Sequence, residues 1–351
     1  LVLFLGWPGV LQAETYRDWS GYTRLAAELG SNLPTGAGVP VAQVEADGNY
    51  TADGVPYGPD ETIAEFDGKT ISYVLGDPPN YPYPYSSHAT GVGRLFYGNT
   101  ASFSPGVTSI TSDQATNWLM EDIYRYVDGA YVQPVDTDRR VANHSWVVKY
   151  DDNVHNSNVL RRLDWLIARD DYIQVVGMNN GGTNYPGLGS AFNAIAVGRS
   201  DGNHAQGSVQ LDSDSDYSSG RTRPDLVAPM GATSSATPLV ASAAALLVGV
   251  GHDGGSLLSN DPEESSTSNR AGNTIYNAER AEVVKATLMA GANRTSPQLT
   301  HEYLVDTANG LNSRYGAGEL DIYASYHILA GGEHNSAEDA PAIGGLIGKV
   351  G

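Results

Sequence analysis

Two short segments of this chain are apolar almost throughout, and they limit the fold more than any other feature. YIQVVGM at 172–178 and NAIAVG at 193–198 show no regular alternation of polar and apolar residues. A strand with one face in water alternates, whereas a strand of a parallel sheet is covered by helices on both faces and is apolar along its length. The sequence therefore predicts an α/β fold with a mostly parallel central sheet.

Helical patterns alternate with further strand-like segments along most of the chain. The clearest helix is predicted at 156–169, where Asn156 or Ser157 can cap the first turn and apolar residues recur on one face. This alternation is typical of a doubly wound sheet with helices on both sides. Strands are predicted at 39–45, 70–75, 107–110, 140–148, 172–178, 193–198 and 225–228. Helices are predicted at 88–97, 113–126, 156–169, 234–250, 279–290 and 319–330.

The chain is strongly acidic and contains no cysteine. Its 351 residues include 40 Asp and Glu against 20 Lys and Arg, for a formal net charge of −20. Because phosphate backbones are bound by basic surfaces, we expect no nucleic acid among its partners. The lack of cysteine excludes disulfide bonds, thiol nucleophiles and thiolate metal sites.

The two ends of the chain differ from the rest in composition. Residues 1–13, LVLFLGWPGVLQA, form an apolar stretch that ends in a small residue, as the last part of a secretory signal peptide does. At 333–351 the periodic pattern ends and the segment is typical of a linker or tail. We therefore expect one folded domain over 14–332 in a secreted or extracellular protein, with the periplasm or the cell surface as alternatives.

Three polar residues stand where predicted strands end or predicted helices begin. Glu45 ends an apolar strand, His88 precedes a small-residue turn into a helix, and Ser234 opens a long apolar helix. In parallel sheets such junctions gather at one edge, where ligands bind. A serine becomes a nucleophile when a base takes its proton, and an imidazole base needs an anion that fixes its tautomer. Together the three residues indicate nucleophilic catalysis, whereas Ser234 alone would indicate a helix cap.

Short motifs in a fixed order resemble those of the subtilisin-like serine peptidases over roughly residues 14–330. HATGVG is similar to the family's HGTHVAG, and TSSATPLVA is similar to the TSMATPHVA around its nucleophile. Each string is short, but their order and spacing make a chance agreement improbable. The resemblance implies the three-layer subtilisin-like fold. It rests on VAQVE at 41–45, HATGVG at 88–93, SPGV at 104–107, NHSW at 143–146, VVGMNNGG at 175–182, IAVG at 195–198, RPDLVAP at 223–229 and TSSATPLVA at 233–241.

The resemblance also implies the roles of the candidate catalytic residues. Matched residue by residue, Ser234 is the nucleophile, His88 is the general base and Glu45 is the acid that orients the imidazole. Asn179 is the side chain that donates a hydrogen bond to the oxyanion, and Asn180 is the alternative. One such donor contributes ~2.7 to 4 kcal/mol to lowering the barrier.

A substrate-binding segment and a narrowed cleft follow from the same resemblance. It implies that Ser145, Trp146 and Val147 line the strand on which a peptide lies, with Val147 where the family usually has glycine. Met178 likewise replaces the glycine before the oxyanion asparagine. Because glycine serves where backbone passes close to a substrate, these changes predict either a preference for small residues or a loss of peptide binding.

The triad acid is the main departure from the family. The family's acid is normally Asp, whereas this strand ends in Glu45, which keeps the charge and adds one methylene. The imidazole or the strand must then lie ~1 Å farther back to preserve the hydrogen bond. Asp47, two residues on and on the same side if the strand continues, is the alternative acid. We favour Glu45 because it stands where VAQV places the family's Asp.

Three aspartates suggest a structural cation. Asp212, Asp214 and Asp216 occupy alternate positions in LDSDSDYSSGRT at 211–222, and calcium is bound by several oxygen ligands. The run lacks the glycine and glutamate of an EF-hand, so a solvated acidic loop is the alternative. No pair of histidines has the spacing of a zinc motif.

We therefore expect a secreted serine endopeptidase that hydrolyses peptide bonds through an acyl-enzyme on Ser234. The reaction requires no cofactor, the substrate is a protein or peptide, and we expect a monomer with no membrane span in the mature chain. Two alternatives remain open. One is a catalytically inactive binding or surface module with the same fold, and the other is an acyl hydrolase that acts on esters.

Overall fold

Seven strands form a central sheet in which every pairing is parallel. The structure is a computed structural model, and it describes residues 15–46, 57–74, 85–211 and 216–334. The strand order is β2-β3-β1-β6-β7-β8-β9, with the long crossovers of a doubly wound sheet. The strands are β1 (Val41–Glu45), β2 (Thr70–Tyr73), β3 (Ser109–Gln114), β6 (Val141–His144), β7 (Ile173–Gly177), β8 (Ile195–Arg199) and β9 (Leu226–Ala228).

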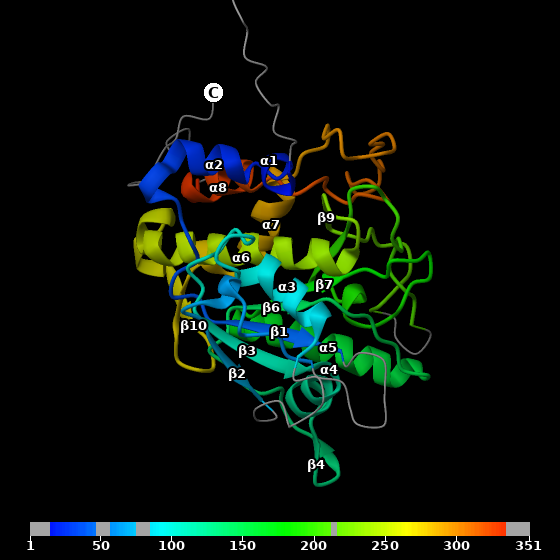
Figure 1. The fold of residues 1–351 in the computed structure, drawn as a ribbon. Coiled ribbons are helices and arrows are strands. Elements are labelled where there is room, and N and C mark those ends of the chain that lie inside the picture. Colours follow the sequence, from blue (N-terminus) through cyan, green and yellow to red (C-terminus); the bar gives the residue numbers. More distant parts are fainter. Residues whose placement is uncertain (1–14, 47–56, 75–84, 212–215, 335–351) are drawn as a thin grey trace, which may run out of the picture.

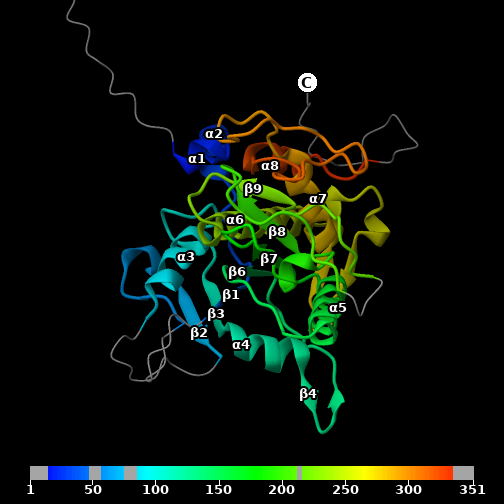
Figure 2. The same ribbon diagram turned by 90° about the vertical axis from the view of Figure 1, so that its right-hand side faces the viewer.

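Helices cover both faces of the sheet (Figure 1 and Figure 2). On one side α6 (Thr233–Gly254) crosses the strands, with α3 (Ser87–Tyr97) and α7 (Ala281–Gly291) packed against it. On the other side lie α5 (Asn153–Asp170) and the helical segment that follows β3. That segment consists of α4 (Ala115–Asn117) and the π-helix η3 (Trp118–Tyr124). The fold is therefore a three-layer α/β fold, as the apolar strands predict.

Smaller elements complete the fold. α1 (Tyr16–Trp19) and α2 (Tyr22–Leu29) lie with α8 (Ile322–Ala330) beyond α6. The α2–α8 contact includes a hydrogen bond from Tyr323 Oη to Glu28 Oε2 at 2.6 Å. Two antiparallel hairpins are β4–β5 (Tyr126–Val127, Ala130–Tyr131) and β10–β11 (Ser266–Ser268, Thr274–Tyr276). The short 3₁₀ helices are η1 (Gly30–Asn32), η2 (Ala64–Phe66), η4 (Leu188–Ser190), η5 (Gly255–Leu258), η6 (Pro262–Glu264) and η7 (Asn277–Glu279).

The long helix α6 is the centre of the hydrophobic core. Small residues such as Ala236 and Ala243 are fully buried and let the helix approach the sheet closely. Among the described helices, Thr233–Leu258 is the one long and apolar enough to cross a membrane, and 89% of its most apolar window is buried inside the fold. Its apolar surface is thus used for packing between the sheet and the neighbouring helices.

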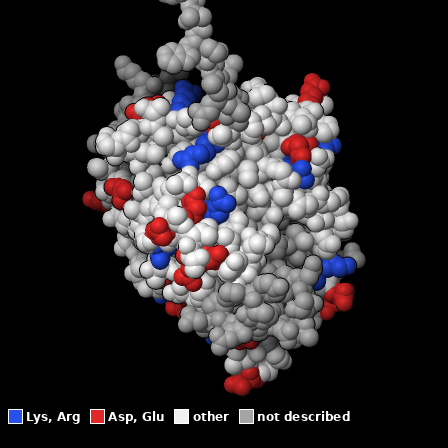
Figure 3. Space-filling model, viewed as in Figure 1, with Lys and Arg blue, Asp and Glu red and all other residues white. Residues whose placement is uncertain are grey.

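Charged groups are mixed on the face of the molecule shown in Figure 3. Lys and Arg side chains alternate there with Asp and Glu, and the described part of this face has no continuous basic surface. A phosphate-rich polymer binds to clustered positive charge. This face of the described chain does not offer such a cluster.

Most predicted elements are present, and their boundaries differ for identifiable reasons. β3 runs four residues beyond the predicted 107–110 because Asp113, a buried polar residue, breaks the apolar pattern. Its carboxylate is paired with Arg139 at 3.0 Å. α5 begins earlier than predicted because the carboxylate of Asp152 accepts a hydrogen bond from His155 N at 2.8 Å and caps the helix. The predicted signal segment 1–13 and most of the predicted tail 333–351 lie outside the described residues.

A buried serine joins the turn at 104–107 to α6. Ser242 Oγ accepts hydrogen bonds from Phe103 N at 2.8 Å and from Ser104 N at 3.0 Å. The same oxygen lies 2.9 Å from Ser104 Oγ, which donates to Phe96 O in α3 at 2.9 Å. One hydroxyl thus satisfies two buried backbone donors and links α6 to α3.

Replacing this hydroxyl will destabilise the fold. Ser242→Ala leaves the amides of Phe103 and Ser104 buried without an acceptor, so we expect the free energy of unfolding to fall by about 2 to 4 kcal/mol. Urea denaturation followed by circular dichroism measures this loss. Ser219→Ala, at an exposed serine, is the matched control and is expected to unfold like the wild type. Equal stabilities of the two variants would contradict this role of Ser242.

Candidate active site

Glu45 and His88 form a hydrogen-bonded pair at the edge of the sheet. Glu45 is the last residue of β1 and its side chain is 1% exposed, whereas His88 lies in the first turn of α3 and is half exposed. Nδ1 of His88 lies 2.9 Å from Glu45 Oε2. Since an ionised carboxylate only accepts, the proton of the neutral imidazole is held on Nδ1 and Nε2 is left basic. The hydrogen bond to Glu45 raises the pKa of His88, and partial burial opposes this effect.

A buried glutamine holds the second oxygen of Glu45. Gln43 Nε2 donates to Glu45 Oε1 at 3.2 Å and to Ala89 O at 2.7 Å, while Gln43 Oε1 accepts a hydrogen bond from Tyr97 Oη. Gln43, Glu45 and Tyr97 are all buried. Sequence reasoning missed Gln43 and Tyr97, although the spacing of Gln43 and Glu45 places both on one face of β1. The carboxylate is thus fixed from both sides.

The candidate nucleophile lies in the first turn of α6. Ser234 is half-buried at the second position of the helix. Ala232 at the N-cap has no side chain that accepts a hydrogen bond, and Asn180 Oδ1 instead accepts from Thr233 N at 2.9 Å. The backbone N–H of Ser234 makes no hydrogen bond to any described residue. The positive end of the helix and this free N–H therefore favour negative charge beside Ser234.

Proline in the first turns of α6 changes the surroundings of Ser234. In an α-helix the carbonyl of Ser234 would accept from the N–H four residues on, but that residue is Pro238 and has no N–H. Ser145 Oγ donates to Ser234 O at 3.0 Å in its place. Ser145 in turn accepts from Asn143 Nδ2 at 3.0 Å. Ser145, which the sequence places along the substrate, thus also fixes the peptide unit of Ser234.

The two neighbouring asparagines of the MNNGG turn have different partners. Asn179 Nδ2 donates to Thr183 O within the same turn at 3.1 Å. Asn180, by contrast, is bonded through its oxygen to Thr233 at the start of α6, and no described residue accepts from its Nδ2. The structure thus fixes Asn180, the alternative oxyanion residue, beside the residue that precedes Ser234.

His88 and Ser234 lie on two helices that contact each other. They occupy the first turns of α3 and α6, respectively (Figure 1). No hydrogen bond joins them: in the described part of the chain, His88 Nε2 and Ser234 Oγ are both without a partner. In free enzymes such catalytic hydrogen bonds are often long and shorten when a substrate binds. The arrangement supplies a basic nitrogen and a hydroxyl in the first turns of two packed helices.

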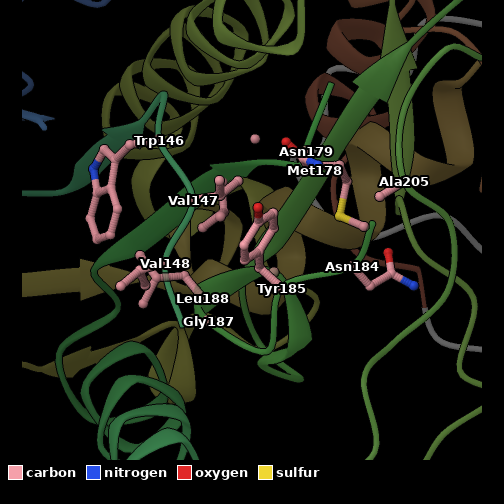
Figure 4. Close-up of a pocket in the computed structure, with 13 residues that line it drawn as sticks. Trp146, Val147, Val148, Met178, Asn179, Asn184, Tyr185, Gly187, Leu188 and Ala205 are labelled. Carbon is pink, nitrogen blue, oxygen red and sulfur yellow. The ribbon is translucent and has the colours of Figure 1, made fainter. Parts of the chain in front are cut away.

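Trp146 and Val147 of the predicted substrate segment line a narrow pocket (Figure 4). Trp146 packs against Trp118 and His144, and Val147 is 41% exposed. The backbone groups of Trp146 and Val147 make no hydrogen bond to another described residue. Such an extended edge can pair with an added peptide strand.

The candidate cation site is only partly described. Asp212 and Asp214 lie outside the described residues, as does Asp47, the alternative triad acid. Asp216 is described, and its carboxylate pairs with Arg161 at 3.3 Å. Within the described ranges, no group of three or more acidic or histidine side chains is arranged to hold a metal ion. Calcium binding therefore stays a prediction.

Two solved structures share this fold. The prenylagaramide maturation protease PagA matches 89% of this chain and 99% of its own, with a TM-score of 0.51 and 17% identity. A serine-to-alanine mutant of the protease domain of PatA, a patellamide maturation protease, matches 87% of this chain and 100% of its own, with a TM-score of 0.52 and 15% identity. No protein-family model and no curated protein matches the sequence. At these identities the likeness establishes the fold.

The pairing of His88 with Glu45 can be tested by titration. Glu45→Gln removes the negative charge that favours the imidazolium, so we expect the pKa of His88 to be lower in the variant than in the wild type. Histidine-resolved NMR over a pH series measures it. Glu28→Gln, which removes a carboxylate on α2, is the control and should leave the His88 titration unchanged. An unchanged pKa in Glu45→Gln would show that another acid, such as Asp47, partners His88.

Proposed function

We propose that this chain, which has the subtilisin-like fold of the two maturation proteases, is a serine endopeptidase that forms an acyl-enzyme on Ser234. The observation that carries the proposal is the Glu45–His88 hydrogen bond, on a helix that packs against the one whose first turn presents Ser234 and its free N–H. Each group has the chemistry that its role requires. The proposal includes secretion, which the apolar segment 1–13 supports.

Acylation is the first half of the proposed reaction. His88 Nε2 takes the proton of Ser234 Oγ while this oxygen forms a bond to the scissile carbonyl carbon. The carbonyl oxygen becomes an oxyanion, and the imidazolium is stabilised by Glu45 through Nδ1–H. His88 then donates the proton to the leaving nitrogen, the carbon–nitrogen bond breaks and the amine departs.

Deacylation repeats the proton transfers with water. His88 Nε2 takes a proton from a water molecule whose oxygen attacks the ester carbon. The second oxyanion collapses, the bond to Ser234 Oγ breaks, and Ser234 recovers its proton from the imidazolium. The acid product leaves and the resting groups are restored, so no external cofactor is consumed.

The backbone N–H of Ser234 and the side chain of Asn180 are the proposed oxyanion donors. Asn180 is favoured over Asn179 because its Oδ1 is anchored 2.9 Å from Thr233 N, which places its unpaired Nδ2 near the start of α6. Asn179 would have to give up its bond to Thr183 O before it could donate. Donors fixed before the reaction lower the barrier without reorganisation.

Labelling with a fluorophosphonate tests the proposed function. We expect a covalent adduct on Ser234, located by mass spectrometry after digestion, and no adduct in His88→Ala. The labelling rate should fall as the pH is lowered through the raised pKa of His88, since only the neutral imidazole accepts a proton. Ser235→Ala, at the next serine, is the control and should still be labelled.

Absence of labelling in folded protein would overturn the proposal. The chain would then be a non-catalytic module with the same fold. Labelled protein that hydrolyses a p-nitrophenyl ester but not casein would instead be an acyl hydrolase acting on esters. Hydrolysis of casein with labelling on Ser234 supports the endopeptidase.

The choice between the two asparagines is tested by mutation. We expect Asn180→Ala to lower kcat for a peptide substrate by about 10²- to 10³-fold and Asn179→Ala to lower it much less. Asn180→Asp separates donation from capping, because it keeps an acceptor for Thr233 N but has no N–H to donate. It should be as slow as Asn180→Ala while its thermal unfolding stays near that of the wild type. A large loss confined to Asn179→Ala would assign the oxyanion role to Asn179.

A further inference from the structure

A small pocket lies next to the segment that fixes the peptide unit of Ser234. One wall is the segment Trp146 to Val148, which directly follows Ser145, the residue bonded to Ser234 O. The opposite wall includes Gly177. A Cβ added to Gly177 would lie 2.9 Å from Thr237 Oγ1 in α6. That Cβ would also lie 3.8 Å from Thr233 O, so this wall of the pocket packs against the first two turns of α6.

Met178 lines this pocket and is itself tightly packed. Its side chain is 8% exposed and packs with Ala196 and Ala205 in a small apolar cluster. Figure 4 shows it between Tyr185 and Ala205. On the facing loop, a Cβ added to Gly189 would lie 3.3 Å from Met178 Sδ, so the two walls nearly touch.

The remaining space is small and its far end is closed. The free volume is about 20 Å³, and one water molecule needs roughly 10 to 15 Å³ by this measure. A hydrogen bond from Gly187 N to Val148 O at 3.0 Å joins the two walls, and an added Cβ on Gly187 would lie 2.3 Å from that oxygen. The pocket thus has room for a methyl or hydroxyl group and not for a ring or a branched chain.

One polar atom in the lining is buried without a partner among the described residues. Asn184 donates through Nδ2 to Gln206 O, which fixes the side chain, while its Oδ1 is buried and unpaired. A buried acceptor without a donor costs free energy, and a hydroxyl group in the pocket could supply the donor. Asn184 Oδ1 is therefore the candidate acceptor in this lining for the hydroxyl of a serine side chain.

We propose that the peptidase cleaves after residues with small side chains, Gly, Ala or Ser, and that Met178 excludes larger ones. The inference rests on the proposed function, because it assigns this pocket to the residue whose carbonyl is attacked. This pocket has no space for additional methylene groups, so it excludes larger side chains by steric clash. Its packed walls cannot move apart without losing contacts of their own.

Peptide substrates that differ only at this residue test the inference. We expect kcat/KM for peptides with alanine or serine before the cleaved bond to exceed that for phenylalanine by at least ~100-fold. Met178→Ala should open the pocket and reduce this preference by ~10-fold or more through faster cleavage after phenylalanine. Met120→Ala, at an exposed methionine in η3, is the matched control and should keep the wild-type preference.

Fluorophosphonate labelling of each variant separates the outcomes. Equal cleavage after alanine and phenylalanine by wild-type protein that is labelled on Ser234 would overturn the inference and leave the proposed function standing. A Met178→Ala variant that is labelled like the wild type but keeps its full preference would also overturn it. No labelling and no cleavage of any peptide would overturn the proposed function itself.

Discussion

The burial of α6 is the constraint on which the rest of the structure depends. This helix packs against β6, β7, β8 and β9 on one side and against α3 and α8 on the other. Its small residues allow the close approach, and Ser242 satisfies backbone donors that this approach buries. A helix held along its length has a fixed first turn, so the position of Ser234 is set by core packing. The first turn of α6 is therefore held rigid by the packing of the core.

The second requirement is to stabilise the buried carboxylate of Glu45, and hydrogen bonds do this. An ionised carboxylate in the interior is costly unless its oxygens are paired. One oxygen of Glu45 is bonded to His88 and the other to Gln43, whose own carbonyl is satisfied by Tyr97. Gly93 leaves room for this network, since an added Cβ would lie 2.6 Å from Tyr97 Oη. Each oxygen of the buried Glu45 carboxylate thus has its own hydrogen-bond partner.

Apolar periodicity predicted the layers but could not predict side-chain partners. The strands around 173–177 and 195–199 were predictable because helices bury both of their faces. β3 and the hairpins were harder to predict. Asp113 in β3 is buried as the partner of a distant Arg139, and most hairpin residues are exposed. The motifs indicated Glu45, His88 and Ser234 because each ends or begins an element. The motifs could not show which of Asn179 and Asn180 is the better candidate for the oxyanion donor. The two asparagines are adjacent in one turn, and they differ in their hydrogen-bond partners, which only the folded structure shows.

The position of Ser234 on the central helix has a consequence for the order of events during folding. Until α6 docks, β6 and β7 have one uncovered face, and the network around Ser242 is not formed. The helix that fills the centre of the core also carries Ser234, the proposed nucleophile. A partly folded chain with an exposed sheet therefore lacks the proposed triad. The proposed reactivity would thus arise only after the core is complete.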